Sequence, residues 1–293
     1  MPPLRVLIQA SIPYRADDWN VGRFSLLAAH LAALRDIDGT TLVSVVTRNR
    51  EPDSADRDPF LLGLSRTDFD EVWLLGVDGG VGLNAEECGV IDAFQAAGGG
   101  VLTARDHQDM GLWLRNLRCM GNANCYHEEA YREPDPSRWQ RDDSDNLSID
   151  FPNYHSGANG DFQRILHVEP LHPLLSNAGS SSGLIEYLPA HPHEGAVRPS
   201  DNRSKTVARG TSKTTGQVFD LAVAFERSAD FSGRGVAESS FHHFTDYNWD
   251  LRRGAPSFVT EAPGNGMELN PRALADTKAY VRNLVRWLAP ATT

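Results

Sequence analysis

Two short, largely apolar segments with a helical pattern between them constrain the fold more than any other stretch of the chain. Residues 72–75 and 101–104 are continuous runs typical of strands buried on both faces of a parallel sheet. Asn84 and Glu87 form a capping-box pattern between the two runs, and Gly98 is placed to end the helix. The stretch therefore predicts a strand–helix–strand unit with parallel strands.

Other apolar runs predict that this sheet continues on both sides of the unit. Residues 4–10 and the β-branched run 40–47 are predicted strands, joined by a helix with its N-cap near Asn20. The last buried strand is predicted at 235–238, and Pro271 begins a C-terminal helix. The strands expected to lie parallel in one sheet are 4–10, 40–47, 72–75 and 101–104. Shorter strands are predicted at 165–168, 184–188, 206–209 and 219–225.

A long irregular segment interrupts this pattern at about residues 111–164. It is rich in Asn, Asp, Arg, Pro and aromatic residues, without clear periodicity. Such a segment is more often a functional loop than a core element, so we expect a lid over a binding site. The alternative is a partly disordered insertion. Residues 1–293 are expected to form one α/β domain with a decorated second half.

The charge and composition restrict the kind of partner. The formal net charge is −11 and no basic run is present, which argues against nucleic acid and anionic membranes. No stretch approaches the ~18 consecutive apolar residues of a membrane span. The chain begins with a predicted strand rather than a signal peptide, and its three cysteines show no Cys-x-x-Cys spacing, so we expect a cytoplasmic protein. A small-molecule substrate is the expected partner, and a homo-oligomer is compatible with the sequence.

Polar side chains follow the predicted strands at the points where these strands end. Asp78 follows the run at 72–75, and Arg105, Asp106 and His107 follow the next strand. In open α/β sheets the ligand crevice lies outside the carboxyl ends of the strands. Asp106 and His107 can act there as an orienting carboxylate and a base. The alternative is a structural ion pair between Arg105 and Asp106.

Two further groups of histidines are candidates for the same crevice. His242 and His243 follow the last predicted strand, together with Glu238, and we expect one of the two imidazoles to face the crevice. Otherwise they pack in a cluster with the neighbouring aromatic residues. His191 and His193 are two residues apart, so in an extended segment both can face one cation. The alternative is a Pro-rich connector whose histidines bond backbone carbonyl groups.

Short motifs in both halves of the chain resemble a known superfamily. They are Phe-Asp-Glu-Val-Trp at 69–73, Ile-x-x-Phe-x-x-x-Gly-Gly-Gly at 91–100, and Gly-Arg-Gly at 233–235 before the histidine-bearing loop. With the order of elements, they resemble the class I glutamine amidotransferase-like superfamily and its trehalose-utilisation (ThuA-like) branch, over residues 4–110 and 184–288. The resemblance implies a flavodoxin-like parallel sheet with helices on both faces. It also implies a hydrolase or isomerase acting on a small polar, carbohydrate-like substrate.

The chain departs from the glutaminases of this superfamily at the place of their nucleophile. Those enzymes carry a Cys on a tight turn after a strand, where this chain has Arg105, Asp106 and His107. The late pattern is Glu238-x-x-x-His242 rather than the His-x-Glu of the amidotransferase triad. We therefore expect no glutaminase activity, because resemblance in fold does not transfer the reaction.

Three functions stay open from the sequence. The first is a ThuA-like enzyme that uses acid–base chemistry, the second is a metal-dependent amide or ester hydrolase with a divalent cation such as zinc, and the third is a non-catalytic ligand-binding module. The expected catalytic residues are Asp106, His107, Glu238, His242 and His243. The expected substrate-binding residues are Trp19, Asp78, Arg105, His155 and Tyr247, and the expected metal ligands are His191 and His193.

The first testable prediction concerns Cys88, Cys119 and Cys125, none of which lies at the predicted strand tip. A thiolate nucleophile needs an activating environment at a fixed place. Replacing all three cysteines by Ala or Ser should therefore leave turnover largely unchanged in a folded variant. Loss of turnover in a triple variant that keeps the wild-type circular dichroism spectrum would show that a thiol takes part in the reaction.

Overall fold

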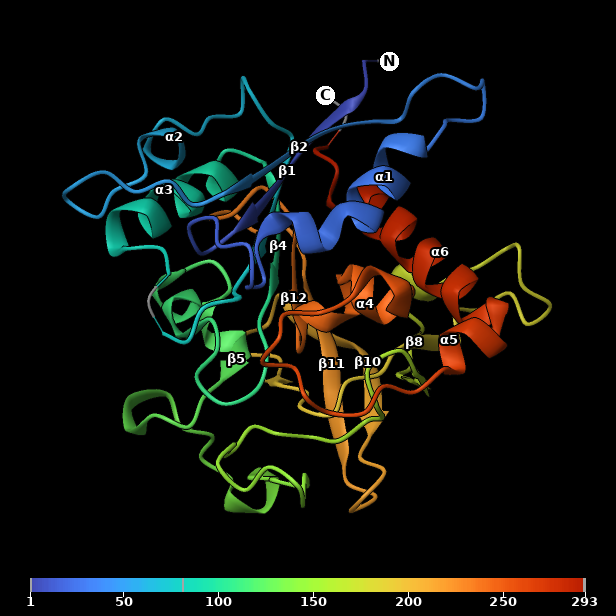
Figure 1. Ribbon diagram of the computed structural model, residues 1–293. Helices are drawn as coiled ribbons and strands as arrows, with labels where there is room; N and C mark the ends of the chain where they lie inside the picture. The colour runs from blue at the N-terminus through green and yellow to red at the C-terminus, as the bar shows by residue number, and fades with distance from the viewer. Residues whose placement is uncertain (1, 81, 292–293) are drawn as a thin grey trace.

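The computed structural model describes residues 2–80 and 82–291 and has a central eight-stranded sheet (Figure 1). The strand order is β2-β1-β3-β4-β12-β11-β10-β7. The first five strands are parallel and follow the flavodoxin-like order, and the last three are antiparallel additions at one edge. The strands are β1 (Leu4–Ala10), β2 (Val43–Asn49), β3 (Glu71–Leu75), β4 (Gly100–Ala104), β7 (Leu166–His167), β10 (Ser204–Thr211), β11 (Val218–Phe225) and β12 (Gly235–Glu238).

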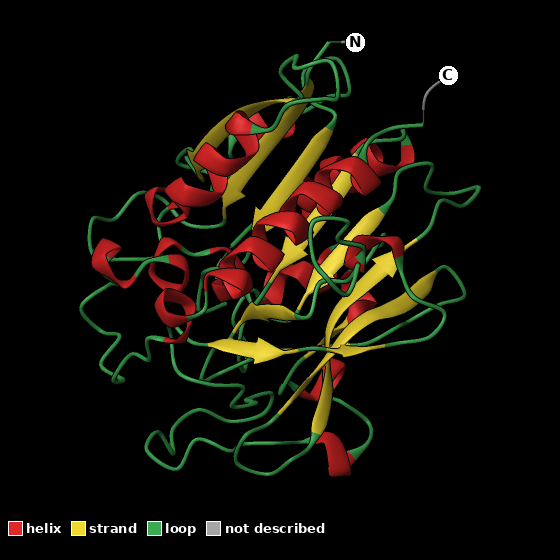
Figure 2. Ribbon diagram, turned by 90° about the vertical axis from the view of Figure 1, so that its right-hand side faces the viewer, coloured by secondary structure: helices red, strands yellow, loops and turns green. Residues whose placement is uncertain are grey.

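Helices cover both faces of the sheet because successive strand residues point to opposite sides. In β1, Val6 and Ile8 belong to the core beneath α1 and α6, whereas Leu7 belongs to the core beneath α2 and α3. Figure 2 shows the long C-terminal helix lying along one face of the sheet. The α-helices are α1 (Ser25–Ala33), α2 (Pro59–Leu62), α3 (Ala85–Ala96), α4 (Asp246–Trp249), α5 (Gly266–Leu269) and α6 (Pro271–Leu288). Within the described ranges, no helix is both long enough and apolar enough to cross a membrane.

The second half adds short elements around the antiparallel edge of the sheet. β5 (Asn124–Cys125) pairs with β9 (Ala196–Val197), and β6 (Phe162–Arg164) pairs with β8 (Tyr187–Pro189), in two separate antiparallel ribbons. The segment at 111–164 is irregular, as expected, with short 3-10 helices and isolated bridges. The 3-10 helices of the chain are Val21–Phe24, Leu112–Asn116, Gly121–Ala123, Glu129–Tyr131, Pro136–Arg138, Pro173–Leu175, Phe241–Phe244 and Leu251–Arg253.

The parallel sheet expected from the sequence is confirmed, although its edge strand lies later than predicted. The prediction placed this strand at 40–47, whereas β2 begins at Val43 opposite Leu4 of β1. The preceding residues are used in a turn, because Asp36 N donates to Thr40 O at 2.9 Å. The β-branched composition of the run therefore extends beyond the strand itself.

The strand predicted at 184–188 does not join the central sheet. Backbone groups of this run are held by other partners, since Ile185 N donates to Leu175 O (2.8 Å) and Glu186 N donates to Asp276 Oδ2 of α6 (2.9 Å). Strand pairing begins only at Tyr187, and its partner is β6. The apolar run is therefore buried against the C-terminal helix rather than inside the sheet.

The capping box of α3 provides a test of the strand–helix–strand unit. Asn84 Oδ1 accepts hydrogen bonds from the backbone of Glu86 and Glu87 at 3.0 Å, and Glu87 Oε2 accepts one from Asn84 N at 2.8 Å. Asn84→Ala should lower the free energy of unfolding by about 1 kcal/mol, as measured by urea denaturation. Asn84→Asp keeps the accepting oxygen and should lose less. Equal losses in the two variants would contradict this account of the helix start.

Candidate functional site

The candidate site begins where the paired strands β4 and β12 end side by side. Ala104 lies opposite Glu238 in parallel register, so the residues that follow the two strands leave the sheet together. Arg105 N donates to Glu238 O at 3.3 Å, and Phe241 N donates to Arg105 O at 2.6 Å. These bonds continue the pairing beyond the strands and bring Asp106 beside the loop that carries His242 and His243.

A third segment crosses the two strand tips from the second half of the chain. It lies between β8 and β9 and carries His191, His193 and Glu194. At Gly195 the backbone approaches the tips so closely that an added Cβ would lie 2.4 Å from the carbonyl oxygens of both Asp106 and Ser239. Only glycine fits at this crossing, and it allows the histidine-bearing segment to reach Asp106.

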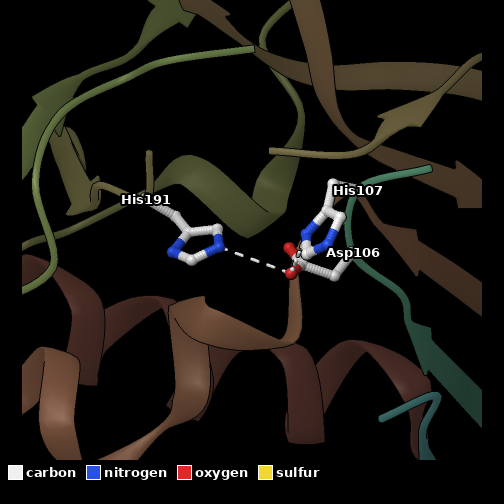
Figure 3. Close-up of side chains that lie close together, drawn as sticks. All are labelled: Asp106, His107 and His191. Atoms are coloured by element: carbon white, nitrogen blue, oxygen red, sulfur yellow. Dashed lines mark hydrogen bonds and ion pairs between the residues drawn. The ribbon is translucent and has the colours of Figure 1, made fainter. Parts of the chain in front are cut away.

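The Asp106 carboxylate is the centre of the group, with a relative exposure of 1%. Its Oδ2 lies 2.9 Å from His107 Nδ1, 3.3 Å from His191 Nε2 and 3.6 Å from His242 Nε2. Its Oδ1 accepts a hydrogen bond of 2.8 Å from Ser240 Oγ. Figure 3 shows the rings of His107 and His191 approaching the carboxylate from two directions.

The charges of this group follow from burial and from one another. Burial by itself raises the pKa of Asp106, but the surrounding imidazoles of His191, His242 and His107 hold it well below the usual range. Burial, together with His191, holds the pKa of His242 well below its usual value. Burial and the neighbouring His191 and His107 lower the pKa of His193 to about 4. At neutral pH the site therefore combines an ionised carboxylate with neutral imidazoles at His193 and His242.

Asparagine side chains orient two of the imidazoles. His242 Nδ1 lies 3.3 Å from Asn248 Oδ1, and the amide of Asn248 is fixed because its Nδ2 donates to Ala190 O at 2.7 Å. His242 Nδ1 therefore carries a proton, and the lone pair of Nε2 faces Asp106. His191 Nδ1 is 2.9 Å from Asn159 Oδ1. The two rings stack with centroids 3.5 Å apart and an angle of 10° between their planes.

His193 lies beside this group but is held by different partners. Its Nδ1 is 3.1 Å from Asn153 Oδ1, and its Nε2 is 3.3 Å from Glu261 Oε1. The rings of His191 and His193 are 5.6 Å apart and nearly perpendicular, at 84°. Both nitrogens of His193 therefore face groups other than Asp106, and the segment between the two histidines turns instead of continuing as an extended strand.

The neighbouring His243 faces the opposite way, into a fully buried ionic cluster. Its Nδ1 is 3.1 Å from Glu238 Oε2 and its Nε2 is 3.4 Å from Glu194, while Tyr280 donates to the other oxygen of Glu238. Burial alone lowers the pKa of His243, but the two carboxylates outweigh it and raise the pKa to about 10. The imidazolium therefore joins the segment that carries His191 to the tip of β12 and to α6.

A cavity of about 690 Å³, which we call the Asp106 cleft, opens over the carboxylate. Its lining includes Trp19, Asp78, Asp106, His107, His191, His193 and His242, so seven of the residues predicted from the sequence meet there. Asn146, Ile149 and Asn159 of the irregular segment also line it. The remaining predicted residues are Arg105, His155, Glu238, His243 and Tyr247, which are not among the described residues that line the cleft.

These remaining residues lie in other environments. Arg105 is fully buried, with its guanidinium 4.1 Å from the centre of the Tyr126 ring. His155 and Tyr247 are half-buried at other places on the chain. Asp78 does line the cleft, but one of its oxygens already accepts hydrogen bonds from Ser11 (2.6 Å) and Trp113 (2.7 Å).

The cysteines lie outside the cleft and are unsuited to act as nucleophiles. Cys88, Cys119 and Cys125 are all buried. Burial raises the pKa of the Cys88 and Cys125 thiols to about 12, and it also raises the pKa of Cys119. All three thiols are therefore protonated at neutral pH.

Several residues of the site were not predicted from the sequence. They are the amides that orient the imidazoles, the carboxylates behind them and the hydroxyl on Asp106, namely Asn153, Asn159, Asn248, Glu194, Glu261 and Ser240. Most lie in loops without hydrophobic periodicity, so no pattern in one sequence marks them. Ser240 had a signal, since it follows a predicted strand tip.

The raised pKa of His243 generates a prediction about stability. A group whose pKa is higher in the folded than in the unfolded protein stabilises the fold fully below its unfolded pKa, near 6.5, and loses this contribution as the pH rises to about 10. The stability lost in His243→Gln should therefore be largest at about pH 6 and should shrink towards pH 10, by on the order of a few kcal/mol. Urea denaturation of both proteins across this range measures it. A difference that stays constant with pH would contradict a buried imidazolium.

The sequence matches no protein-family model and no curated protein. In structure, the chain is similar to the mmIFT52 N-terminal domain, with 11% identity over 83% of this chain and 88% of that one and a TM-score of 0.45. It is similar to a ThuA-like protein from Parabacteroides merdae, with 12% identity, 81% and 79% coverage and a TM-score of 0.47. It is also similar to the glutaminase domain of Trypanosoma brucei CTPS with bound acivicin, with 13% identity, 95% and 94% coverage and a TM-score of 0.44.

Proposed function

We propose that this chain is an enzyme that hydrolyses a small polar substrate in the Asp106 cleft. The observation that carries the proposal is one buried carboxylate oxygen with three imidazole nitrogens within 3.6 Å of it, at the floor of a cavity. Titratable groups that perturb one another in this way are typical of catalytic sites. The position outside the carboxyl ends of parallel strands is the usual ligand site of such sheets.

The nucleophile in this proposal is water. The three cysteines are buried and protonated, and the cleft offers imidazoles instead. In hydrolysis, water gives one proton to a base, its oxygen bonds to the electrophilic carbon of the substrate, and the leaving group departs with the proton. His242 fits the role of base because it is neutral and lines the cleft. Its Nδ1 faces Asn248, and its Nε2 accepts no hydrogen bond from a described residue, so the lone pair of Nε2 can take a proton. His243 fits a positioning role, because both of its nitrogens bind buried carboxylates.

The shape of the cleft supports a substrate of the size of a small carbohydrate. Its volume of about 690 Å³ lies within the ~300–1,000 Å³ of typical small-molecule sites. Trp19, Phe241 and Phe258 contribute aromatic surface, and Arg15, Asp18 and Asn146 contribute polar groups at the cleft. Residues of the segment at 111–164 form part of the wall, which supports its role as a cover over bound substrate.

Turnover measurements on cleft variants test the proposal. A panel of small chromogenic glycosides, esters and amides supplies the substrate, and Asp106→Asn and His242→Gln should each lower turnover by ~100-fold or more. Both variants should keep the wild-type circular dichroism spectrum. His30→Gln serves as the matched control, because His30 lies on α1 and bonds the backbone of Lys278. Turnover that survives in Asp106→Asn would place the chemistry elsewhere.

A further inference from the structure

The His191 ring directs one buried nitrogen towards the Asp106 carboxylate. Its Nε2 is buried, with the residue only 3% exposed, and it has no hydrogen-bond partner among the described residues. The nitrogen nevertheless lies 3.3 Å from Oδ2 of the ionised Asp106. Nδ1 is 2.9 Å from Asn159 Oδ1, and in the neutral tautomer that donates this hydrogen bond Nε2 directs a lone pair towards a negatively charged oxygen. Two electron-rich atoms at this distance repel each other unless a positive charge lies between them.

The surrounding geometry fits a metal ion as that positive charge. One oxygen of Asp106, one ring nitrogen of His107 and one of His191 all lie within 4.8 Å of one another (Figure 3). Ligands about 2.0–2.1 Å from a tetrahedral ion lie about 3.4 Å apart, close to the 3.3 Å between Asp106 and His191. We propose that Asp106, His107 and His191 bind one divalent transition-metal ion, for which two imidazoles and a carboxylate are a suitable ligand set.

The neighbours of these three residues support the same assignment. Asn159 contacts the far nitrogen of His191, and Ser240 binds Oδ1 of Asp106, so Nε2 of His191 faces Oδ2, the same oxygen that His107 Nδ1 contacts at 2.9 Å. Hydrogen bonds of this kind orient the ligands of metal sites. His242 Nε2 lies farther from Asp106 Oδ2, at 3.6 Å, and His242 is not in the group of described residues whose ligand atoms lie within 4.8 Å of one another. His242 therefore stays outside the ligand set.

This assignment differs from a site made by His191 and His193. Both nitrogens of His193 have partners of their own in Asn153 and Glu261, and its ring is nearly perpendicular to that of His191. A proton shared between His191 and Asp106 is the other competing arrangement. The contact of 3.3 Å is not aligned as a hydrogen bond, which disfavours it.

The binding of the ion does not depend on the proposed function. Only its use in catalysis rests on that proposal. A divalent ion lowers the pKa of a bound water to about 7 and so supplies hydroxide at neutral pH. Held by Asp106, His107 and His191, the ion would make water in the cleft a stronger nucleophile towards the electrophilic carbon, and the proton that this water loses would go to the leaving group as the bond to it breaks. The substrates that suit this chemistry are esters and amides of small polar molecules. His107 then acts as a ligand, and His242 stays free to exchange protons with solvent and substrate.

Metal titration of the full chain tests the site without any substrate. Protein purified without a histidine tag and stripped with a chelator is titrated with Zn²⁺ by calorimetry and with Co²⁺ by visible absorption. The wild type should bind one equivalent, and Co²⁺ should give the intense bands of a tetrahedral ion. Asp106→Asn and His191→Gln should each weaken binding by ~100-fold or more, because each removes a ligand. His30→Gln, which removes a histidine outside the cleft, should bind as the wild type does.

Three results would overturn the inference. They are the absence of binding by the wild type, an unchanged affinity in Asp106→Asn, and a loss in His193→Gln as large as that in His191→Gln. X-ray absorption at the zinc edge of the wild type needs no variant, so it decides the matter if a variant fails to fold. It should show two imidazoles and a carboxylate around the ion, and a shell without imidazoles would contradict the site.

The inference and the proposed function fail in different ways. If Asp106→Asn abolishes turnover but the wild type binds no ion, the metal site is wrong and the hydrolytic function stands without it. If the ion binds as expected but turnover is the same in Asp106→Asn, the metal site stands and the proposed function is wrong.

Discussion

The parallel pairing of β4 with β12 determines where Asp106 and His242 lie in the Asp106 cleft. Asp106 and Ser240 are 134 positions apart in sequence, yet they leave neighbouring strand tips and form a hydrogen bond of 2.8 Å. The backbone bonds between Arg105 and the residues around β12 extend this pairing past the sheet. Without it, neither the carboxylate nor His242 would face the cleft. The core of the fold and the geometry of the site therefore depend on the same strand register.

A buried ionic cluster behind the cleft fixes the third segment on this frame. Glu194 accepts hydrogen bonds from Ser156, Gln163 and Ser239 and faces the imidazolium of His243. A buried charge is tolerated only when it is paired and hydrogen-bonded, and here each member is. Glu194 lies three residues after His191, so the cluster anchors the segment that delivers this histidine. Substitutions in the cluster are therefore expected to act on the cleft through position.

The sequence predicted the parallel half of the fold and the Asp106 tip for physical reasons. Strands buried on both faces appear as short apolar runs, and the residues that follow them must reach the crevice. Neighbouring residues at these tips differ in what they face. Asp106 lines the cleft whereas Arg105 packs on Tyr126, and His242 lines the cleft whereas His243, next to it in the 3-10 helix Phe241–Phe244, faces Glu238. The sequence does not indicate which member of each pair faces the cleft.

The position of His191 and the roles of the asparagines could not be derived in this way. The run at 184–188, before His191, packs on α6 and does not join the central sheet. No strand direction therefore predicts where the following loop goes. Asn159 and Asn248 matter only because tertiary contacts place their oxygens against ring nitrogens. The charge of the site depends on where the ring protons lie. Long-range ¹⁵N–¹H NMR of the histidine rings at about pH 8 measures them directly. We expect a proton on Nδ1 alone in His242 and protons on both nitrogens in His243, and a doubly protonated ring at His242 or a neutral ring at His243 would contradict the charges derived for the site.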